Sequence, residues 1–352
     1  MYIYISMNNN NDYSKYADNG LTGLVNLGNT CYLNSCMQIF SHCYVLNEII
    51  DARVNEKSIN DTIESVLLVE WNELRRLMWA NNNCVISPNR YVNAVQKISA
   101  KKGRELFTGF IQNDFPEFLV FLLDCFHSAL KRDVVMQVKG RIKSDMDRLA
   151  AKCYETLKTH FDNDYSIIID KFYGVQVTQI QSIDTKETLS VATEPYCLIS
   201  LAVTPTTTSI YDCLDEYCKS ELMTGDNAWF NDKTATYQPV EKSIAFWNLP
   251  EILVIDLKRF DNRLRKIAQH ISVPTTSLDL SKYVVGYNKA KYVYNLFGVS
   301  NHMGTAFSGH YTAYVKNAND KWYEFNDQSV TPRDERQVVT PNAYCFFFIR
   351  QR

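Results

Sequence analysis

The stretch GLVNLGNTCYLNSCMQIF, residues 23–40, combines two glycines, three asparagines and two cysteines where a loop gives way to a helical pattern. Asn29 and Thr30 are good N-cap residues, and apolar side chains recur after them at helical spacing, so we expect a helix whose first turn contains Cys31. Free N–H groups and the helix dipole favour a thiolate there. Cys31 is a candidate nucleophile, although many free cysteines are simply small buried side chains.

The composition is that of a globular protein with reduced thiols. The formal charge of −2 gives no reason to expect nucleic acid or a membrane surface as partner. The start lacks the order of a signal peptide and no apolar run of about 18 residues appears, so we expect an intracellular protein, cytoplasmic or nuclear, without a membrane segment. The ten cysteines include no Cys-x-x-Cys pair, and we expect neither disulfides, nor a metal, nor a cofactor.

The spacing of apolar residues divides the chain into two halves. Intervals of three and four predict helices within 32–50, 61–80, 88–100 and 114–160, where 131–160 is expected to be a solvated charged helix. Short β-rich runs follow from residue 166: SIIID, VQVTQI, EILVIDLKRF, KYVYNLFGV, HYTAYVK, KWYEFND and AYCFFFIR. This segregation indicates an α+β protein with a helical lobe (20–165) facing an antiparallel sheet lobe (166–352), preceded by a flexible leader (1–19).

A nucleophilic thiol needs a base, which is usually histidine. Four of the six histidines lie in helical patterns or a polar loop and are expected to be packed or surface groups: His42, His127, His160 and His270. His302 and His310 differ, because both lie in NHMGTAFSGHYTAYVK, where a glycine-bearing loop leads into a strand. Gly309 leaves room around the His310 imidazole.

The segment after His310 predicts a hairpin. HYTAYVK and KWYEF flank the turn signal NAND (317–320). A turn centred at 318, or between 318 and 319, places His310 opposite Asn326 or Asp327, either of which could accept the imidazole N–H. A one-residue change of register decides between them. Asn26 could donate to the oxyanion of an acyl transfer, although its spacing favours a role in the turn.

The two motifs resemble a known family. GLVNLGNTCYLNS and GHYTAYVKNANDKWYEFNDQSV are similar to the cysteine and histidine boxes of the ubiquitin-specific proteases, papain-like deubiquitinating enzymes. Further landmarks follow in order: FTGFIQNDFPEFL (107–119), NLPEILVIDLKRF (248–260), VPTTSLDLSKY (273–283), YNLFGVSNHMG (294–304) and AYCFFFIR. The resemblance runs from about Gly20 to Arg350.

This resemblance implies a cysteine deubiquitinase acting on ubiquitin or ubiquitin-conjugated proteins, with 20–352 as one catalytic domain. The implied fold is a hand with a helical thumb, an antiparallel β palm and β fingers. The implied catalytic residues are the nucleophile Cys31, the base His310, the orienting Asn326 with Asp327 adjacent, and the oxyanion donor Asn26. Around the channel for the Gly-Gly tail, the resemblance implies contacts from Gln112, Asp114, His302, Gly309 and Tyr311.

Two departures from the family pattern matter. Where many members carry two zinc-binding Cys-x-x-Cys pairs at the fingertips, this chain has Ser182, Thr185, Asn231 and Thr234, so we expect no zinc. Asn113, Phe115 and Pro116 replace commoner residues, which indicates altered substrate contacts. Two alternatives stay open: a ubiquitin-binding scaffold without activity, and an enzyme for a ubiquitin-like modifier.

Overall fold

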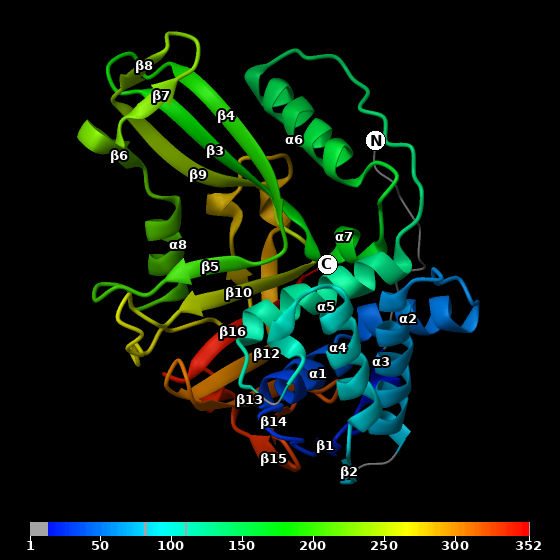
Figure 1. The fold of residues 1–352 in the computed structure, drawn as a ribbon. Coiled ribbons are helices and arrows are strands. Elements are labelled where there is room, and N and C mark those ends of the chain that lie inside the picture. The colour runs from blue at the N-terminus through cyan, green and yellow to red at the C-terminus, as the bar shows by residue number, and fades with distance from the viewer. Residues whose placement is uncertain (1–12, 81–82, 110, 352) are drawn as a thin grey trace.

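The computed structural model describes residues 13–80, 83–109 and 111–351, and in it a helical lobe packs against one end of a long sheet (Figure 1). The α+β class predicted from the sequence is confirmed. The helices are α1 Cys31–Ser41, α2 Tyr44–Asn55, α3 Ile63–Ala80, α4 Asn89–Lys101, α5 Phe115–Leu130, α6 Asp145–Phe161, α7 Ile167–Phe172 and α8 Ile210–Cys218.

The main sheet has the strand order β15-β14-β13-β12-β16-β10-β5, with β11 paired to β12. Its strands are β5 Ile199–Ala202, β10 Ile252–Lys258, β11 Leu278–Asp279, β12 Val293–Gly304, β13 Gly309–Lys316, β14 Trp322–Asn326, β15 Ser329–Arg333 and β16 Ala343–Arg350. The pairs are antiparallel, as the sequence predicts, except β5–β10 at the edge of the sheet, which is parallel.

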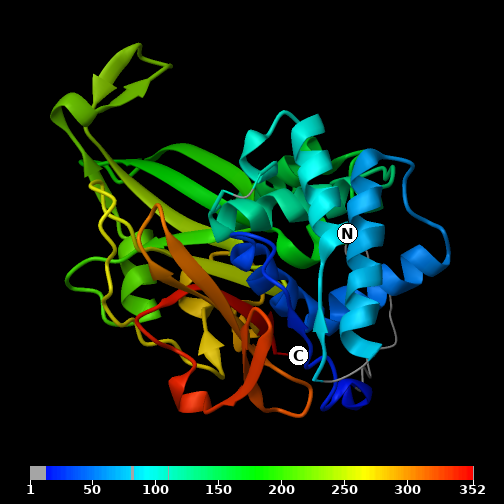
Figure 2. The ribbon, with the colours of Figure 1, turned by 60° about the horizontal axis from the view of Figure 1, so that its bottom comes forward.

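A second sheet forms the elongated part of the molecule. It has the order β4-β3-β9-β6, from β3 Gly174–Ser182, β4 Thr188–Tyr196, β6 Glu221–Met223 and β9 Val240–Asn248. The hairpin of β7 Trp229–Asn231 and β8 Thr236–Gln238 projects beyond it (Figure 2). A short parallel pair, β1 Gly23–Leu24 and β2 Val85–Ile86, joins the segment before α1 to the segment before α4.

Helix α1 lies at the junction of the two lobes, and all its residues are buried. It contacts α5 on one side and β12, β13 and β14 on the other (Figure 1). Its buried polar side chains are bonded to neighbouring segments: the Ser35 hydroxyl lies 3.0 Å from that of Ser300 on β12, and Gln38 donates to the carbonyl of Thr22, just before β1, at 2.8 Å. A helix buried on all sides cannot rotate freely about its axis, so the position of Cys31 is fixed by packing.

Three sequence predictions are wrong in detail. The helix predicted over 32–50 breaks after Ser41, where Asn47 donates to the Phe40 and Ser41 carbonyls at 2.9 and 2.8 Å. Residues 131–143 are not helical, and α6 begins only after Ser144, whose hydroxyl accepts from Asp147 N–H at 3.2 Å. The run SIIID, predicted as a strand, contains the start of α7, because Ser166 caps a helix whose Ile168, Ile169 and Phe172 face the core.

The predicted leader is only partly described, since residues 1–12 lie outside the described part of the chain. Residues 13–19 contact the helical lobe: the Tyr16 ring stacks on Tyr44 at 4.9 Å and meets Trp79 edge-on at 5.3 Å. The expectation of a loose segment therefore fails for residues 13–19.

The four residues at the expected fingertip positions make turn contacts. Ser182 accepts from Thr185 N–H at 3.3 Å and Asn231 accepts from Lys233 N–H at 3.0 Å, while the Thr234 hydroxyl lies 2.8 Å from that of Thr236. In the described ranges, no three His, Cys, Asp or Glu side chains gather as metal ligands would. None of the described helices has the length and apolar character that a bilayer crossing requires.

Candidate active site

Cys31 is the first residue of α1, as the sequence predicts, and is 2% exposed. The loop before it is bent by Asn29, whose φ is +53°, and the Thr30 hydroxyl accepts from Leu27 N–H at 2.9 Å instead of capping the helix. The backbone of Tyr311, on β13, lies close enough to the Cys31 sulfur to lower the pKa of its thiol. The thiol therefore lies against the strand that carries His310.

Burial, and not the helix start, has the largest effect on the pKa of the Cys31 thiol. Burial raises the pKa of the Cys31 thiol above its ordinary value; the hydrogen bond from Tyr311 opposes this rise, and the nearby charge of Asp327 adds to it. Loss of hydration disfavours the charged thiolate.

His310 lies at the start of β13, and its Nε2 donates to Asn326 Oδ1 at 2.7 Å. The predicted register is wrong, because Ala313 pairs with Phe325 and Lys316 with Trp322, which puts the centre of the turn at residue 319. In this register Asn326 is a diagonal neighbour of His310 on the same sheet face. The contact between His310 and Asn326 is therefore diagonal, whereas the sequence predicts that His310 lies directly opposite Asn326 or Asp327.

Asp327 turns away from the imidazole. Its Oδ2 lies 3.9 Å from His310 Nε2, too far for a hydrogen bond. A φ of +47° redirects the chain at this residue, and the carboxylate accepts from Asn26 Nδ2 at 3.0 Å and Asn34 Nδ2 at 2.8 Å. The Asp327 carbonyl also accepts from Leu24 N–H at 2.8 Å. Asp327 therefore connects the hairpin to the loop and helix of Cys31.

Asn26 has a structural role in the loop and also presents an amide. Its Oδ1 accepts from the N–H groups of Gly28 and Thr30, each at 3.1 Å, which makes the turn that spacing favours. One hydrogen of its Nδ2 is used by Asp327. An amide nitrogen carries two hydrogens, so a second donor remains.

The predicted channel residues gather where the lobes meet. Gln112 Oε1 accepts from Gly309 N–H at 2.7 Å, and Asp114 Oδ1 accepts from the hydroxyls of Tyr311 and Tyr344 at 3.1 and 3.0 Å. Burial raises the pKa of Asp114, while both tyrosine hydroxyls lower it. The helical lobe is thereby bonded to the sheet lobe beside Cys31.

His302 is a packed ring. It is 3% exposed, and its ring centre lies 4.7 Å from Tyr311 and 5.6 Å from Phe260. Burial, then the charges of Lys266 and His310, lower the pKa of His302 to about 4, so the imidazole is neutral. A Cβ at position 309 would collide with His302 Nε2, which explains the glycine before His310.

Sequence reasoning missed three residues of this region. Asn34 could have been found from its position one helical turn after Cys31. Tyr344 and Asp256 carry no local signal, because their β-rich surroundings predict only core positions. Burial raises the pKa of Asp256 to about 6, with Ser200 donating at 2.5 Å and the charge of Asp114 contributing to the rise.

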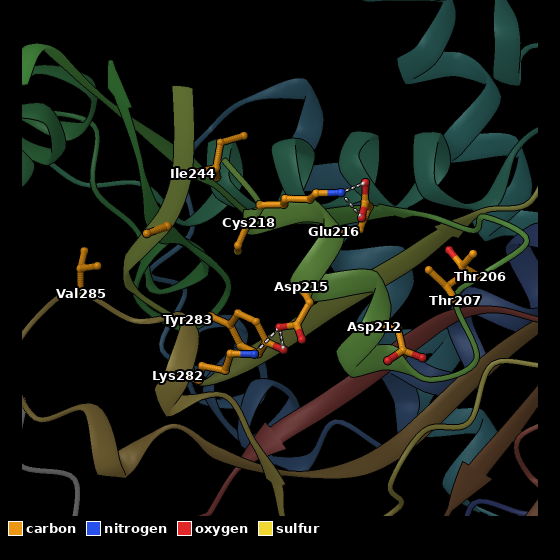
Figure 3. A pocket seen from close by; sticks show the side chains of 12 residues that line it. Thr206, Thr207, Asp212, Asp215, Glu216, Cys218, Ile244, Lys282, Tyr283 and Val285 are labelled. Carbon is orange, nitrogen blue, oxygen red and sulfur yellow. Dashed lines mark hydrogen bonds and ion pairs between the residues drawn. The ribbon is translucent and has the colours of Figure 1, made fainter. Parts of the chain in front are cut away.

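A hollow of about 680 Å³ lies elsewhere, between α8, β9 and the loop near Tyr283 (Figure 3). Its charged groups are used within the fold: Asp215 accepts from Lys282 at 2.6 Å and Tyr283 at 2.8 Å, and Asp212 completes the capping box of α8. None of the predicted site residues lines it.

Comparison with known proteins gives a consistent result. The family model described as ubiquitin carboxyl-terminal hydrolase matches residues 22–348. Ubiquitin carboxyl-terminal hydrolase 2 of Bos taurus is 32% identical over 342 residues, covering 94% of this chain and 55% of the relative, and the enzyme of that name in Gallus gallus is 31% identical over 343 residues, covering 94% and 93%. The chain thus spans about half the length of the Bos taurus relative.

Solved structures share the fold. A chain of the structure titled SAGA Ubp8/Sgf11/Sus1/Sgf73 DUB module bound to ubiquitin aldehyde aligns with a TM-score of 0.74 at 20% identity, covering 96% of this chain and 71% of that one. A related module bound to monoubiquitin gives 0.73 at 21%, covering 95% and 70%. Together with the matched family model, these findings show that the chain belongs to the ubiquitin carboxyl-terminal hydrolase family, in agreement with its resemblance to the ubiquitin-specific proteases.

Proposed function

We propose that this chain is a thiol-dependent deubiquitinase that hydrolyses the isopeptide or peptide bond after the C-terminal glycine of ubiquitin. The observation that carries the proposal is the adjacency of His310 and Tyr311. Asn326 holds the His310 imidazole at 2.7 Å, and Tyr311, the next residue, lies on the strand that packs against the helix of Cys31. The nucleophile at the start of α1 therefore lies beside the strands that carry the base and its orienting group.

In the proposed reaction, His310 Nδ1 takes the proton of the Cys31 thiol as the sulfur attacks the carbonyl carbon. Asn326 holds Nε2–H and thereby fixes the tautomer that leaves Nδ1 able to accept. The electron pair of the C=O bond moves to oxygen, where the free N–H of Asn26 stabilises it. Collapse breaks the C–N bond, His310 returns the proton to the leaving amine, and water then hydrolyses the thioester by the same route.

The proposed roles of the channel residues follow from their bonds. Gln112 and Asp114 grip the extended tail, and Gly309, Tyr311 and His302 border its path. Solved members of the fold carry monoubiquitin or ubiquitin aldehyde according to their titles, which supports ubiquitin as the partner. A tail that ends in two glycines has no side chains to obstruct such a path.

The test uses ubiquitin carrying a C-terminal fluorogenic amide, in the presence of reductant. We expect hydrolysis by the unchanged protein and none by Cys31→Ala. Cys36→Ala is the matched control, because Cys36 is a second buried cysteine of α1 and should keep the activity. Absence of hydrolysis, or equal hydrolysis by Cys31→Ala, rejects the proposal. Parallel substrates made from ubiquitin-like modifiers identify the modifier.

A further inference from the structure

Asn34 is a buried side chain one helical turn after Cys31. It is 2% exposed, and its Nδ2 donates to Asp327 Oδ1 at 2.8 Å and to the Val25 carbonyl at 3.3 Å. Residues three apart lie on the same side of a helix, so the side chains of Cys31 and Asn34 face the same part of the protein. The amide of Asn34 therefore ties the helix of the thiol to the end of β14.

The carboxylate of Asp327 relays this contact to Asn26. Each of its oxygens accepts one amide hydrogen, Oδ1 from Asn34 and Oδ2 from Asn26 at 3.0 Å. Two donors on a carboxylate fix the rotation of its plane, because rotating one oxygen away from its donor breaks both bonds. The direction of the Asn26 amide thus depends on Asn34 through Asp327.

The same carboxylate does not align the base. Asp327 Oδ2 lies 3.9 Å from His310 Nε2, whereas Asn326 Oδ1 lies 2.7 Å away. The positioning of the imidazole and that of the Asn26 amide are therefore separate, although Asn326 and Asp327 are adjacent in sequence.

We propose that Asn34 is a positioning residue for the oxyanion donor: through Asp327 it orients the Asn26 amide, and it leaves the alignment of His310 to Asn326. This inference rests on the proposed deubiquitinase reaction. It assigns Asn34 an effect on the charged tetrahedral state and none on ubiquitin binding, since the residue is buried behind Asp327.

The first test separates binding of the ground state from binding of the tetrahedral state. Ubiquitin with a C-terminal aldehyde forms a tetrahedral adduct with the thiol, in which the former carbonyl oxygen occupies the oxyanion position, whereas unmodified ubiquitin does not. We expect Asn34→Ala to lower kcat about 10- to 100-fold with KM unchanged within about twofold, because one oxyanion donor contributes about 10²–10³ in rate. Affinity for the aldehyde should fall at least about tenfold relative to unmodified ubiquitin.

The second test is a double-mutant cycle between Asn34 and Asn26. If Asn34 acts through Asn26, the double variant Asn26→Ala/Asn34→Ala is no slower than Asn26→Ala alone. Losses that multiply would overturn the proposal, as would an unchanged ratio of aldehyde to ubiquitin affinity.

A matched variant controls for loss of stability. Asn47 is also 2% exposed and donates two hydrogen bonds, to carbonyls at the end of α1, so Asn47→Ala should lower the melting temperature without changing the affinity ratio. If Asn34→Ala is insoluble, the near-isosteric Asn34→Leu is used. If both are insoluble, the cycle of Asp327→Ala with Asn26→Ala decides, because Asp327 is the relay. An inactive unchanged protein would reject the proposed function itself, whereas an active one with normal Asn34 variants rejects only this inference.

Discussion

At the scale of single residues, hydrogen bonds position the side chains of the site, whereas burial shifts the pKa of the Cys31 thiol. Cys31 is buried, and His310 is held by a neutral amide. Because burial raises the pKa of the Cys31 thiol, the proposed reaction needs His310 to take its proton.

The ionisation of Cys31 can be measured directly. Because burial raises its pKa, we expect the alkylation rate of Cys31 by iodoacetamide to rise with pH and to reach its midpoint above the ordinary cysteine value of about 8.5. The thiolate, which is the reactive form, is populated only above that pKa. Mass spectrometry of the peptide that contains Cys31 distinguishes it from the exposed Cys84. A midpoint below pH 7 would indicate a preformed thiolate–imidazolium pair.

The hydrogen bond from His310 to Asn326 predicts unequal effects of two substitutions. His310→Ala removes the base and should lower kcat at least about 10³-fold, whereas Asn326→Ala removes only orientation and should lower it about 10- to 100-fold. An amide lends no negative charge to the imidazolium. Rates with the fluorogenic ubiquitin substrate test this division, and equal losses would contradict it.

At the scale of elements, the hairpin β13–β14 shows how far sequence reasoning extends. The alternation in HYTAYVK and KWYEF predicts both strands, but the turn is longer than the signal NAND because Asn317 N–H donates to the Lys321 carbonyl at 2.9 Å. The Asn317 side chain is held from outside the hairpin: its Oδ1 accepts from Asp18 N–H at 3.1 Å and its Nδ2 donates to the Asn19 carbonyl at 2.7 Å. Local patterns do not contain this tertiary contact.

Asn317→Ala should release residues 13–19 from the hairpin. The variant loses both side-chain bonds to Asp18 and Asn19 from a site that is 3% exposed, and we expect destabilisation by about 1–3 kcal/mol. Thermal unfolding measures the loss, and limited proteolysis should cut within 13–19 sooner. Lys321→Ala serves as a comparison at an exposed position of the same turn, and an equal loss there would contradict the argument.

Other elements also differ in how much of their structure can be predicted from local sequence. The start of a helix at Cys31 follows from local cap signals, and α3 and α4 follow from the spacing of apolar residues. α7 was mistaken for a strand because three isoleucines favour β structure, although Ser166 is a good N-cap. From the sequence, the hydrogen-bond partner of His310 can be limited to Asn326 or Asp327. The hydrogen bonds of Asp327 with Asn26 and Asn34 depend on a positive φ at Asp327, which the sequence does not specify.

At the scale of the whole molecule, one buried network joins the two lobes. Asp114 at the start of α5 accepts from tyrosines of β13 and β16, and its charge contributes to the raised pKa of Asp256 on β10. Buried carboxyls that repel each other reduce stability when both are charged.

Asp256→Asn should therefore stabilise the protein at high pH. The folded protein binds the Asp256 proton with a pKa of about 6, against 3.8 for the ordinary carboxyl, so this residue costs stability above pH 6 and the cost disappears as pH falls toward 3.8. We expect the variant to gain about 2–3 kcal/mol at pH 8 and close to nothing at pH 4. Urea unfolding at both pH values measures the difference, and a gain independent of pH would contradict the cause.

The bond between Gln112 and Gly309 has a consequence for the end of each cycle of the proposed reaction. Because Gln112 Oε1 occupies the Gly309 N–H at 2.7 Å in the free protein, the side chain competes with any cleaved peptide that has taken its place. When the product departs, Gln112 again accepts the Gly309 N–H. This regained hydrogen bond offsets part of the enthalpy that is lost with the bonds to the tail. We expect free ubiquitin to be a weak inhibitor, and departure of the product not to limit turnover.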